Sequence, residues 1–147
     1  MDFEKSLSHQ GSDHKGRTLN DIWSFSDEQI EGIHDFIQLI FPTNKKSQSL
    51  FHGLYLDSEE LIDTLKANEQ VRQSLIKSSK WFLGFLHRNN HWKRRYDHNQ
   101  LRITRVTESL RLLVSDEKAD NFRNSVLSLL EPDNRISETT LNFWMTA

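Results

Sequence analysis

The chain has 147 residues, of which 35% are hydrophobic and 27% charged, and its formal net charge is −2. This length suits one domain with a core of its own, and the small net charge argues against wholesale binding of polyanions. The absence of cysteine excludes disulfides, thiol catalysis and cysteine-ligated metals.

The N-terminal segment 1–15 is polar and lacks the apolar stretch of a signal peptide. We predict a flexible tail over 1–15, followed by one domain over 16–147. Thr18 with Asp21 three residues later predicts a short turn of helix. No apolar run approaches the roughly 20 residues that cross a bilayer, so no membrane span is expected.

The segment 27–40 is predicted to be one amphipathic helix. Ser26 with Gln29 forms a capping box at its start, and Pro42 marks its end. Apolar residues recur between them at helical spacing, at Ile30, Ile33, Ile37 and Ile40.

Five further helices are predicted from caps and apolar spacing. A long connection over 43–56, anchored by Leu54 and Leu56, precedes them. The helices begin at Asp57, at Asn68, at Asp97 or Asn99, at Ser115 and at Ser137. In the third of these, the apolar positions are Leu101, Ile103, Val106, Leu110 and Leu113. No convincing sheet appears, so the predicted fold is an all-α, compact single-domain bundle of about six helices.

The region 87–105 is basic, with six Arg or Lys residues against the single acid Asp97. Within it, "HWKRRY" (91–96) combines three cations with Trp92 and Tyr96. Aromatic rings stack on nucleic-acid bases while cations contact phosphates, so nucleic-acid binding is one interpretation. A solvated loop is the other.

His34 and Asp35 lie on the predicted first helix, with Gln38 one turn beyond His34. Adjacent helical residues point about 100° apart, so His34 and Asp35 cannot act on each other as a base and its orienting acid. Two interpretations stay open: satisfied structural side chains, or a polar pocket shared with the segment "HNQLRITR" (98–105).

Arg102 and Arg105 share one face of the helix predicted after Asp97. Paired guanidinium groups suit a carboxylate or phosphate ligand, but internal ion pairs with Asp27, Glu31 or Asp35 are the favoured interpretation.

The spacing of His87 and His91 suits a metal only in a continuous helix, and Asn89-Asn90 interrupts it. We therefore expect no metal and no cofactor. No nucleophile elbow or phosphate-binding glycine loop is present, so we expect no enzymatic activity.

Three stretches resemble the N-terminal domain of the opioid growth factor receptor family: "GRTLNDIWSFSDEQIEGIHDFIQLIFP" (16–42), "HNQLRITRVTESLRLL" (98–113) and "ISETTLNFWMTA" (136–147). The resemblance implies an all-α, non-catalytic domain, and the chain is similar to the short stand-alone members. In animal members it implies an enkephalin-binding growth regulator associated with the nucleus.

From these observations we expect a peptide- or protein-binding or regulatory module, with nucleic-acid binding as the alternative. We expect a cytoplasmic location, nuclear or perinuclear in a eukaryotic cell by the resemblance. We also expect His34 to face the segment 98–105, with Asp35 paired to Arg102 or Arg105. The predicted binding residues are His34, Asp35, Gln38, His98, Asn99, Arg102 and Arg105.

Overall fold

The structure, a computed structural model, describes residues 1–46 and 54–147. Within these ranges the regular elements are helices and no strand occurs, which confirms the all-α prediction. The α-helices are α1 (Phe3–Leu7), α2 (Leu19–Trp23), α3 (Asp27–Gly32), α4 (Ile37–Ile40), α5 (Glu59–Ala67), α6 (Glu69–Arg88), α7 (His98–Leu113), α8 (Asp116–Ser128) and α9 (Glu138–Thr146), and a short 3₁₀ helix, η1 (His91–Lys93), precedes α7.

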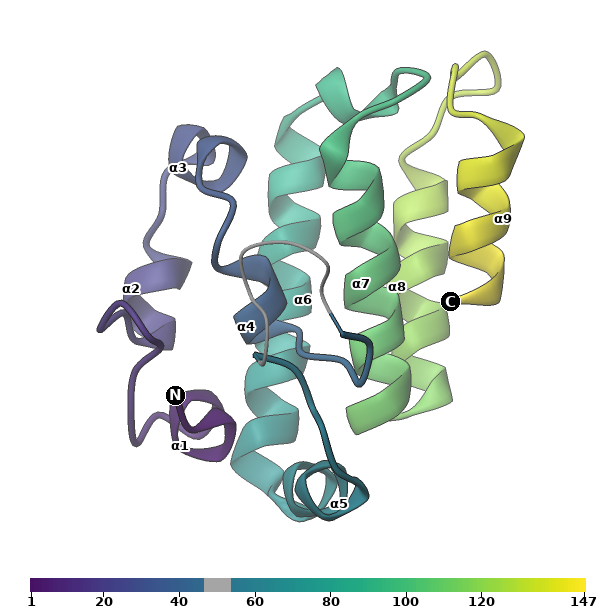
Figure 1. Cartoon of the computed structure of the whole chain (residues 1–147). Coiled ribbons are helices and arrows are strands. Elements are labelled where there is room, and N and C mark those ends of the chain that lie inside the picture. The colour runs from purple at the N-terminus through teal and green to yellow at the C-terminus, as the bar shows by residue number, and fades with distance from the viewer. Residues whose placement is uncertain (47–53) are drawn as a thin grey trace.

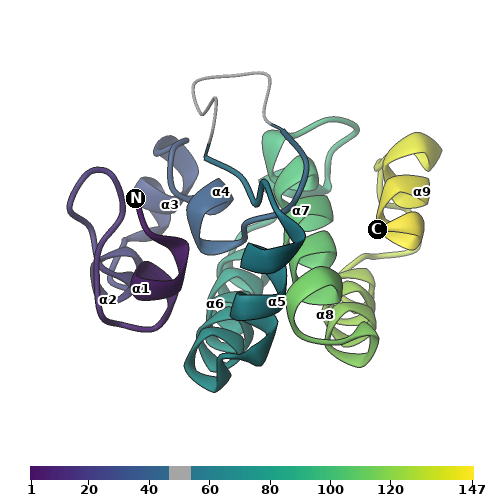
Figure 2. The ribbon, with the colours of Figure 1, turned by 60° about the horizontal axis from the view of Figure 1, so that its bottom comes forward.

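Helices α6, α7, α8 and α9 stand side by side (Figure 1). The short helices α1 to α4 lie on the flank formed by α6, and α5 crosses one end of the bundle. Turned by 60°, the molecule shows α9 on the side opposite α1, α2 and α3 (Figure 2). Helix α7 therefore has neighbours on both sides, with α4 on one and α9 on the other.

The helix starts follow the caps predicted from the sequence. Thr18 and Ser26 each form a complete capping box. Side-chain oxygens of four further N-cap residues accept backbone N–H groups of their helices, at Asn68, Asp97, Ser115 and Ser137. One predicted cap is wrong, because Ser58 rather than Asp57 caps α5.

The N-terminal segment is not the flexible tail that its polar composition suggested. Residues Phe3–Leu7 form α1, and the side chains of Phe3 and Leu7 are buried in the main core. Helix α1 packs against α6. The expected domain boundary at residue 16 is therefore corrected, since the core begins at Phe3.

The segment 27–40 is two short helices, not one. Helix α3 ends at Gly32, Ile33 is extended, and α4 begins only at Ile37. His34 and Asp35 consequently lie in a connecting loop rather than on a helix face. Ile37 is buried as predicted, but Ile33 is only partly buried.

One buried cluster joins side chains from α1 through α9. Four apolar side chains of α6 are fully buried in it: Val71, Leu75, Phe82 and Phe85. Of the apolar positions of α7, Ile103, Val106, Leu110 and Leu113 are buried, whereas Leu101 is 72% exposed.

The connection after α4 is described only at its ends. Leu56 is buried and Leu54 packs against the core, as expected of its anchors. Residues 47–53 of that predicted connection lie outside the described residues. Among the helices that the structure describes, none has the length and apolar character needed to cross a membrane.

Candidate functional site

Three side chains on one face of α7 donate hydrogen bonds to main-chain carbonyl oxygens of the segment 30–42. Arg102 donates to Ile30 O (2.7 Å) and Ile33 O (2.8 Å). Arg105 donates to Gln38 O (3.3 Å) and Phe41 O (3.0 Å), and Ser109 to Pro42 O (2.8 Å). We call this face of α7, made by Arg102, Arg105 and Ser109, the carbonyl-binding face.

These contacts explain why the first helix is interrupted. In a continuous helix, the carbonyls of Ile30 and Ile33 would accept the N–H groups four residues later. Arg102 supplies those hydrogen bonds instead. The carbonyl of Gln38 has no helical donor in any case, because Pro42 lacks an N–H group, and Arg105 supplies one.

The predicted ion pair between Asp35 and Arg102 or Arg105 is wrong. Within the described chain, no carboxylate lies within salt-bridge distance of either guanidinium. Burial lowers the pKa of both groups below the ordinary value, although nearby acids oppose this. Because Arg102 is 6% exposed and both of its Nη groups donate hydrogen bonds within the chain, it is not available as the predicted anion receptor.

Asp35 pairs with Lys15, at the end of the predicted tail, and with Arg17, just after it. Its carboxylate contacts Lys15 and accepts a hydrogen bond from Arg17 Nη1 at 2.8 Å. Arg17 also donates to the buried Asp13 at 2.7 Å. Burial alone would raise the pKa of Asp35, but the Lys15 and Arg17 contacts hold it below its ordinary value. This cluster ties the N-terminal segment to the α3–α4 loop.

Gln38 lies on α4 beside the carbonyl-binding face but takes no part through its side chain. Its Oε1 atom is buried and has no hydrogen-bond partner among residues 1–46 and 54–147. Its backbone carbonyl, as noted, accepts from Arg105.

His34 and His98 do meet, as predicted: their ring centroids are 5.2 Å apart. His98 Nε2 lies 3.0 Å from Glu31 Oε1, and His91 Nε2 lies 2.6 Å from Glu31 Oε2. Asn99 also donates to Glu31 Oε2, at 3.0 Å. The predicted set therefore divides: His98 and Asn99 contact Glu31, His34 lies beside His98, and Asp35 is held by Lys15 and Arg17.

Glu31 is the centre of this histidine cluster. The sequence suggested it only as an ion-pair partner for arginine. Burial alone would raise its pKa, but hydrogen bonds from Asn99 and His91 and the charge of His98 keep it below the ordinary value. Glu31 is therefore a carboxylate at neutral pH. Its environment depends on α3, η1 and α7 together, which no local sequence pattern indicates.

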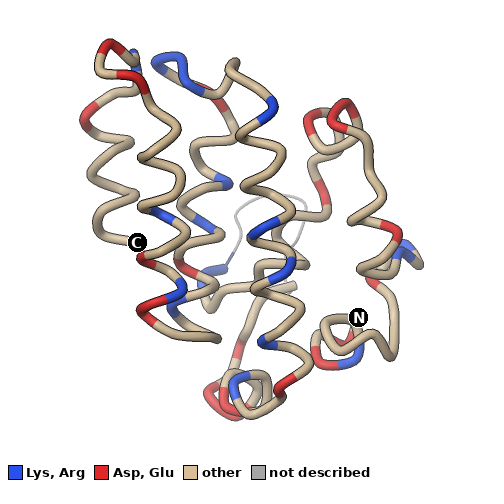
Figure 3. Tube along the Cα trace, turned by 180° about the vertical axis from the view of Figure 1, so that it is seen from behind, with Lys and Arg blue, Asp and Glu red and all other residues tan. Residues whose placement is uncertain are grey.

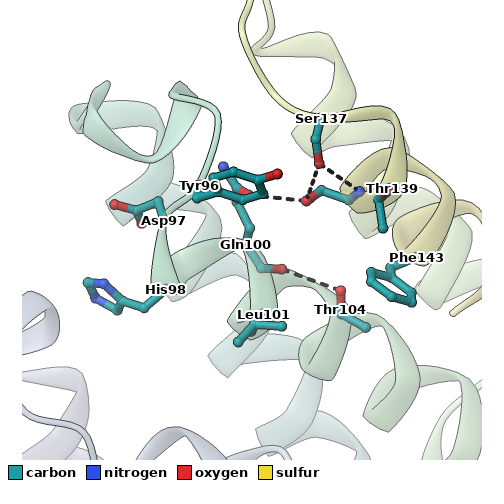
Figure 4. A pocket seen from close by; sticks show the side chains of 10 residues that line it. Tyr96, Asp97, His98, Gln100, Leu101, Thr104, Ser137, Thr139 and Phe143 are labelled. Carbon is teal, nitrogen blue, oxygen red and sulfur yellow. Dashed lines mark hydrogen bonds between the residues drawn. The ribbon is translucent and has the colours of Figure 1, made fainter.

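A hollow of about 560 Å³ lies between α7, α9 and the loop before α7 (Figure 4). We call it the α7–α9 groove. Three large side chains border it from different elements and remain exposed: Tyr96 at 66%, Leu101 at 72% and Phe143 at 54%. Of the residues that line this groove, the sequence predicted a binding role only for His98. The one signal of the groove itself was the Phe143-Trp144 pair, because two adjacent helical residues cannot both face the core, and Trp144 is the one that is buried.

Polar groups form the floor and the far wall of the groove. The buried Gln100 donates to the carbonyls of Trp92 (3.0 Å) and Arg94 (2.7 Å). Its Oε1 accepts from Thr140 at 3.3 Å, and Trp144 Nε1 donates to its backbone carbonyl at 3.1 Å. Gln100 thus fixes the loop, α7 and α9 relative to one another, and the groove is held open by a rigid base.

Much of the basic region 87–105 is paired within the chain. Arg88 contacts Asp27, Lys93 contacts Glu131, and Arg94 contacts Asp97. Figure 3 shows basic residues of the loop before α7 next to the acidic turn after α8. Trp92 is fully buried and therefore cannot stack on bases as one interpretation required, whereas Arg95 is exposed over the Tyr96 ring.

The fold and this geometry define an all-α domain with an open groove and a carboxylate–histidine cluster. A family model described as the opioid growth factor receptor (OGFr) conserved region matches residues 3–144. The chain therefore belongs to this family, and the resemblance seen in the sequence is confirmed. The match also begins at the residue where the core begins. Searches of curated proteins and of solved structures found no match.

Proposed function

We propose that this chain is a non-enzymatic binding module that holds a peptide or a segment of another protein in the α7–α9 groove. The observation that carries the proposal is the convergence of Tyr96, Leu101 and Phe143 on one hollow while all three stay exposed. Apolar groups around a concavity with a few fixed polar groups are typical of ligand sites.

The charge beside the groove indicates the chemistry of the occupant. Arg94 and Arg95 are exposed and contact residues that line the groove, because Arg95 lies over the Tyr96 ring and Arg94 pairs with Asp97. The polar wall formed by Ser137, Thr139 and Thr140 offers hydroxyl groups. The best-matched occupant is a short segment with an aromatic or large aliphatic side chain beside an acidic one. The apolar side chain fills the hollow, and the carboxylate meets Arg95.

Nucleic-acid binding is the weaker candidate. Of the groups that it needed, Trp92 is buried, Arg102 and Arg105 donate to main-chain carbonyls, and Arg95 is exposed. Binding to a single-stranded oligonucleotide would fall steeply with salt, whereas insertion of an apolar side chain into the groove depends less on salt.

A peptide array followed by fluorescence anisotropy tests the proposal. We expect the bound peptides to combine an aromatic or aliphatic residue with Asp or Glu. Leu101→Ser and Phe143→Ser should each weaken binding roughly tenfold, as removal of an anchoring contact does. Met145→Ser is the matched control, because Met145 is equally exposed on the same helix and does not line the groove.

Two results would contradict the proposal: no saturable peptide binding, or an effect of Met145→Ser equal to that of Phe143→Ser. A binding signal for an oligonucleotide that is lost in Arg95→Gln and unaffected by Phe143→Ser would favour the nucleic-acid alternative.

The proposed location is the cytoplasm, with nuclear or perinuclear association in a eukaryotic cell, on the strength of the family. Imaging of a fluorescent fusion tests it, and accumulation outside the cell would contradict it.

A further inference from the structure

We propose that Glu31, Asp97 and His98 form a binding site for a divalent transition-metal ion of the Zn²⁺ class. Glu31 is near the end of α3, Asp97 caps α7, and His98 is the first residue of α7. One donor atom from each lies within 4.8 Å of the other two. A metal about 2.1 Å from each ligand needs the donor atoms to converge in this way.

The cluster has the supporting contacts that orient metal ligands. Asn99 Oδ1 accepts a hydrogen bond from Arg102 at 3.2 Å, so its Nδ2 group is directed at Glu31. Asn99 and His91 both engage Glu31 Oε2, which leaves Oε1 facing His98 Nε2 at 3.0 Å. Hydrogen bonds of this kind, behind the ligands themselves, fix carboxylate orientation in metal sites.

The donor set and the charge select the kind of ion. Two carboxylates close together repel each other, and a divalent cation bound between them would remove this repulsion. An imidazole nitrogen among oxygen donors favours Zn²⁺, Co²⁺ or Ni²⁺ over Ca²⁺ and Mg²⁺, which prefer oxygen ligands alone. The side chains of Glu31 and His98 are 32% and 39% exposed, so an ion has a path from solvent.

Other charged groups face the cluster and define what must move. Arg94 contacts Asp97 Oδ2 at 3.1 Å, whereas Asp97 Oδ1 accepts the backbone N–H of Asn99. The Arg94 side chain is 62% exposed, so its departure costs little. Arg102 is anchored on carbonyl oxygens and stays, and the exposed His34 ring borders the open side next to His98.

Titration of the chelator-stripped full chain with Zn²⁺ by calorimetry, and with Co²⁺ by visible absorption, tests the site. We expect one ion per chain. His98→Ala and Asp97→Asn should each weaken binding at least about tenfold. Asp97→Asn retains the helix cap, since Asn caps as well as Asp, so the loss is not a failure to fold.

Two further variants sharpen the experiment. Arg94→Ala removes the cation that competes for Asp97 and should leave binding equal or tighter. His87→Ala removes an exposed histidine outside the cluster and should leave it unchanged.

Absence of saturable Zn²⁺ binding overturns the proposal. So does binding that survives His98→Ala undiminished or that is lost in His87→Ala. These results are distinct from those for the peptide groove, because the peptide titrations are made in chelator and use Leu101 and Phe143, which are not metal ligands.

Discussion

Arg102 shows how one buried guanidinium replaces the hydrogen bonds of an interrupted helix. Its two Nη groups contact the carbonyls of Ile30 and Ile33 and the amide oxygen of Asn99. Hydrogen bonds from charged donors contribute about 1.5–3 kcal/mol each, which helps to offset the burial of the charge. The planar arrangement of the donors, more than the charge, is what the site requires.

Arg102→Lys should therefore lower the free energy of unfolding by about 1–3 kcal/mol, because an ammonium group cannot reach both carbonyls and leaves one unsatisfied. Urea denaturation followed by circular dichroism measures this. Arg95→Lys, at an exposed position, is the control. Equal stabilities for Arg102→Lys and the parent would contradict the role assigned to the planar guanidinium group of Arg102.

Asp35 makes stability depend on pH in the acidic range. Its folded-state pKa lies below the ordinary value of 3.8, so its contribution is fully present above pH 3.8 and is lost as the pH falls through the folded value. We expect Asp35→Asn to be less stable than the parent at neutral pH. The difference in unfolding free energy should shrink below pH 3.8. A difference that is constant down to pH 2.5 would contradict this.

At the scale of the elements, the break after α3 predicts a stabilising substitution. Gly32 is the last residue of α3, its φ is not positive, and a Cβ atom there would meet nothing within 4 Å. Gly32→Ala should therefore raise the unfolding free energy by about 0.4–1 kcal/mol, by restricting the unfolded chain.

Gly16 supplies the matched contrast for Gly32. It also has open space around its Cβ position, but its φ is +77°, where a side chain is strained. Gly16→Ala should lower stability by about 1–2 kcal/mol. Thermal melts of the two variants measure whether the melting temperature rises or falls in each. A shift in the same direction in both variants would contradict the explanation from backbone conformation.

Local signals in the sequence predicted the helices well. The prediction failed where contacts between residues far apart in the sequence determine the structure. Caps such as Ser26 and Asn68 act within three residues, and they are where they were expected. The break at Ile33 depends on Arg102, far along the chain, so the helical spacing of 27–40 could not reveal it. The same holds for the candidate site: the proximity of His34 and His98 was predicted, but Glu31 and the α7–α9 groove required the fold.

At the scale of the whole molecule, one buried cluster extends from Phe3 in α1 to Trp144 in α9. The described chain should therefore unfold as one unit. Thermal unfolding followed by tryptophan fluorescence and by far-ultraviolet circular dichroism should give superimposable transitions. Ile37→Ala should lower the midpoints of both transitions together. It should lower the free energy of unfolding by roughly 2–5 kcal/mol, because truncation of a buried side chain leaves a cavity. Separate transitions for the two probes would contradict a single cooperative unit.

The carbonyl-binding face of α7 has a consequence for how the chain tolerates change. The hydrogen bonds that Arg102, Arg105 and Ser109 donate to the segment 30–42 all end on main-chain carbonyls, and every amino acid presents the same carbonyl group. Exposed positions of that segment, such as His34, can therefore be replaced without loosening its attachment. The three α7 positions have no such freedom. In a comprehensive mutational library selected for folding, the two sides of this contact should differ sharply: permissive along the loop, and nearly invariant along the helix that holds it.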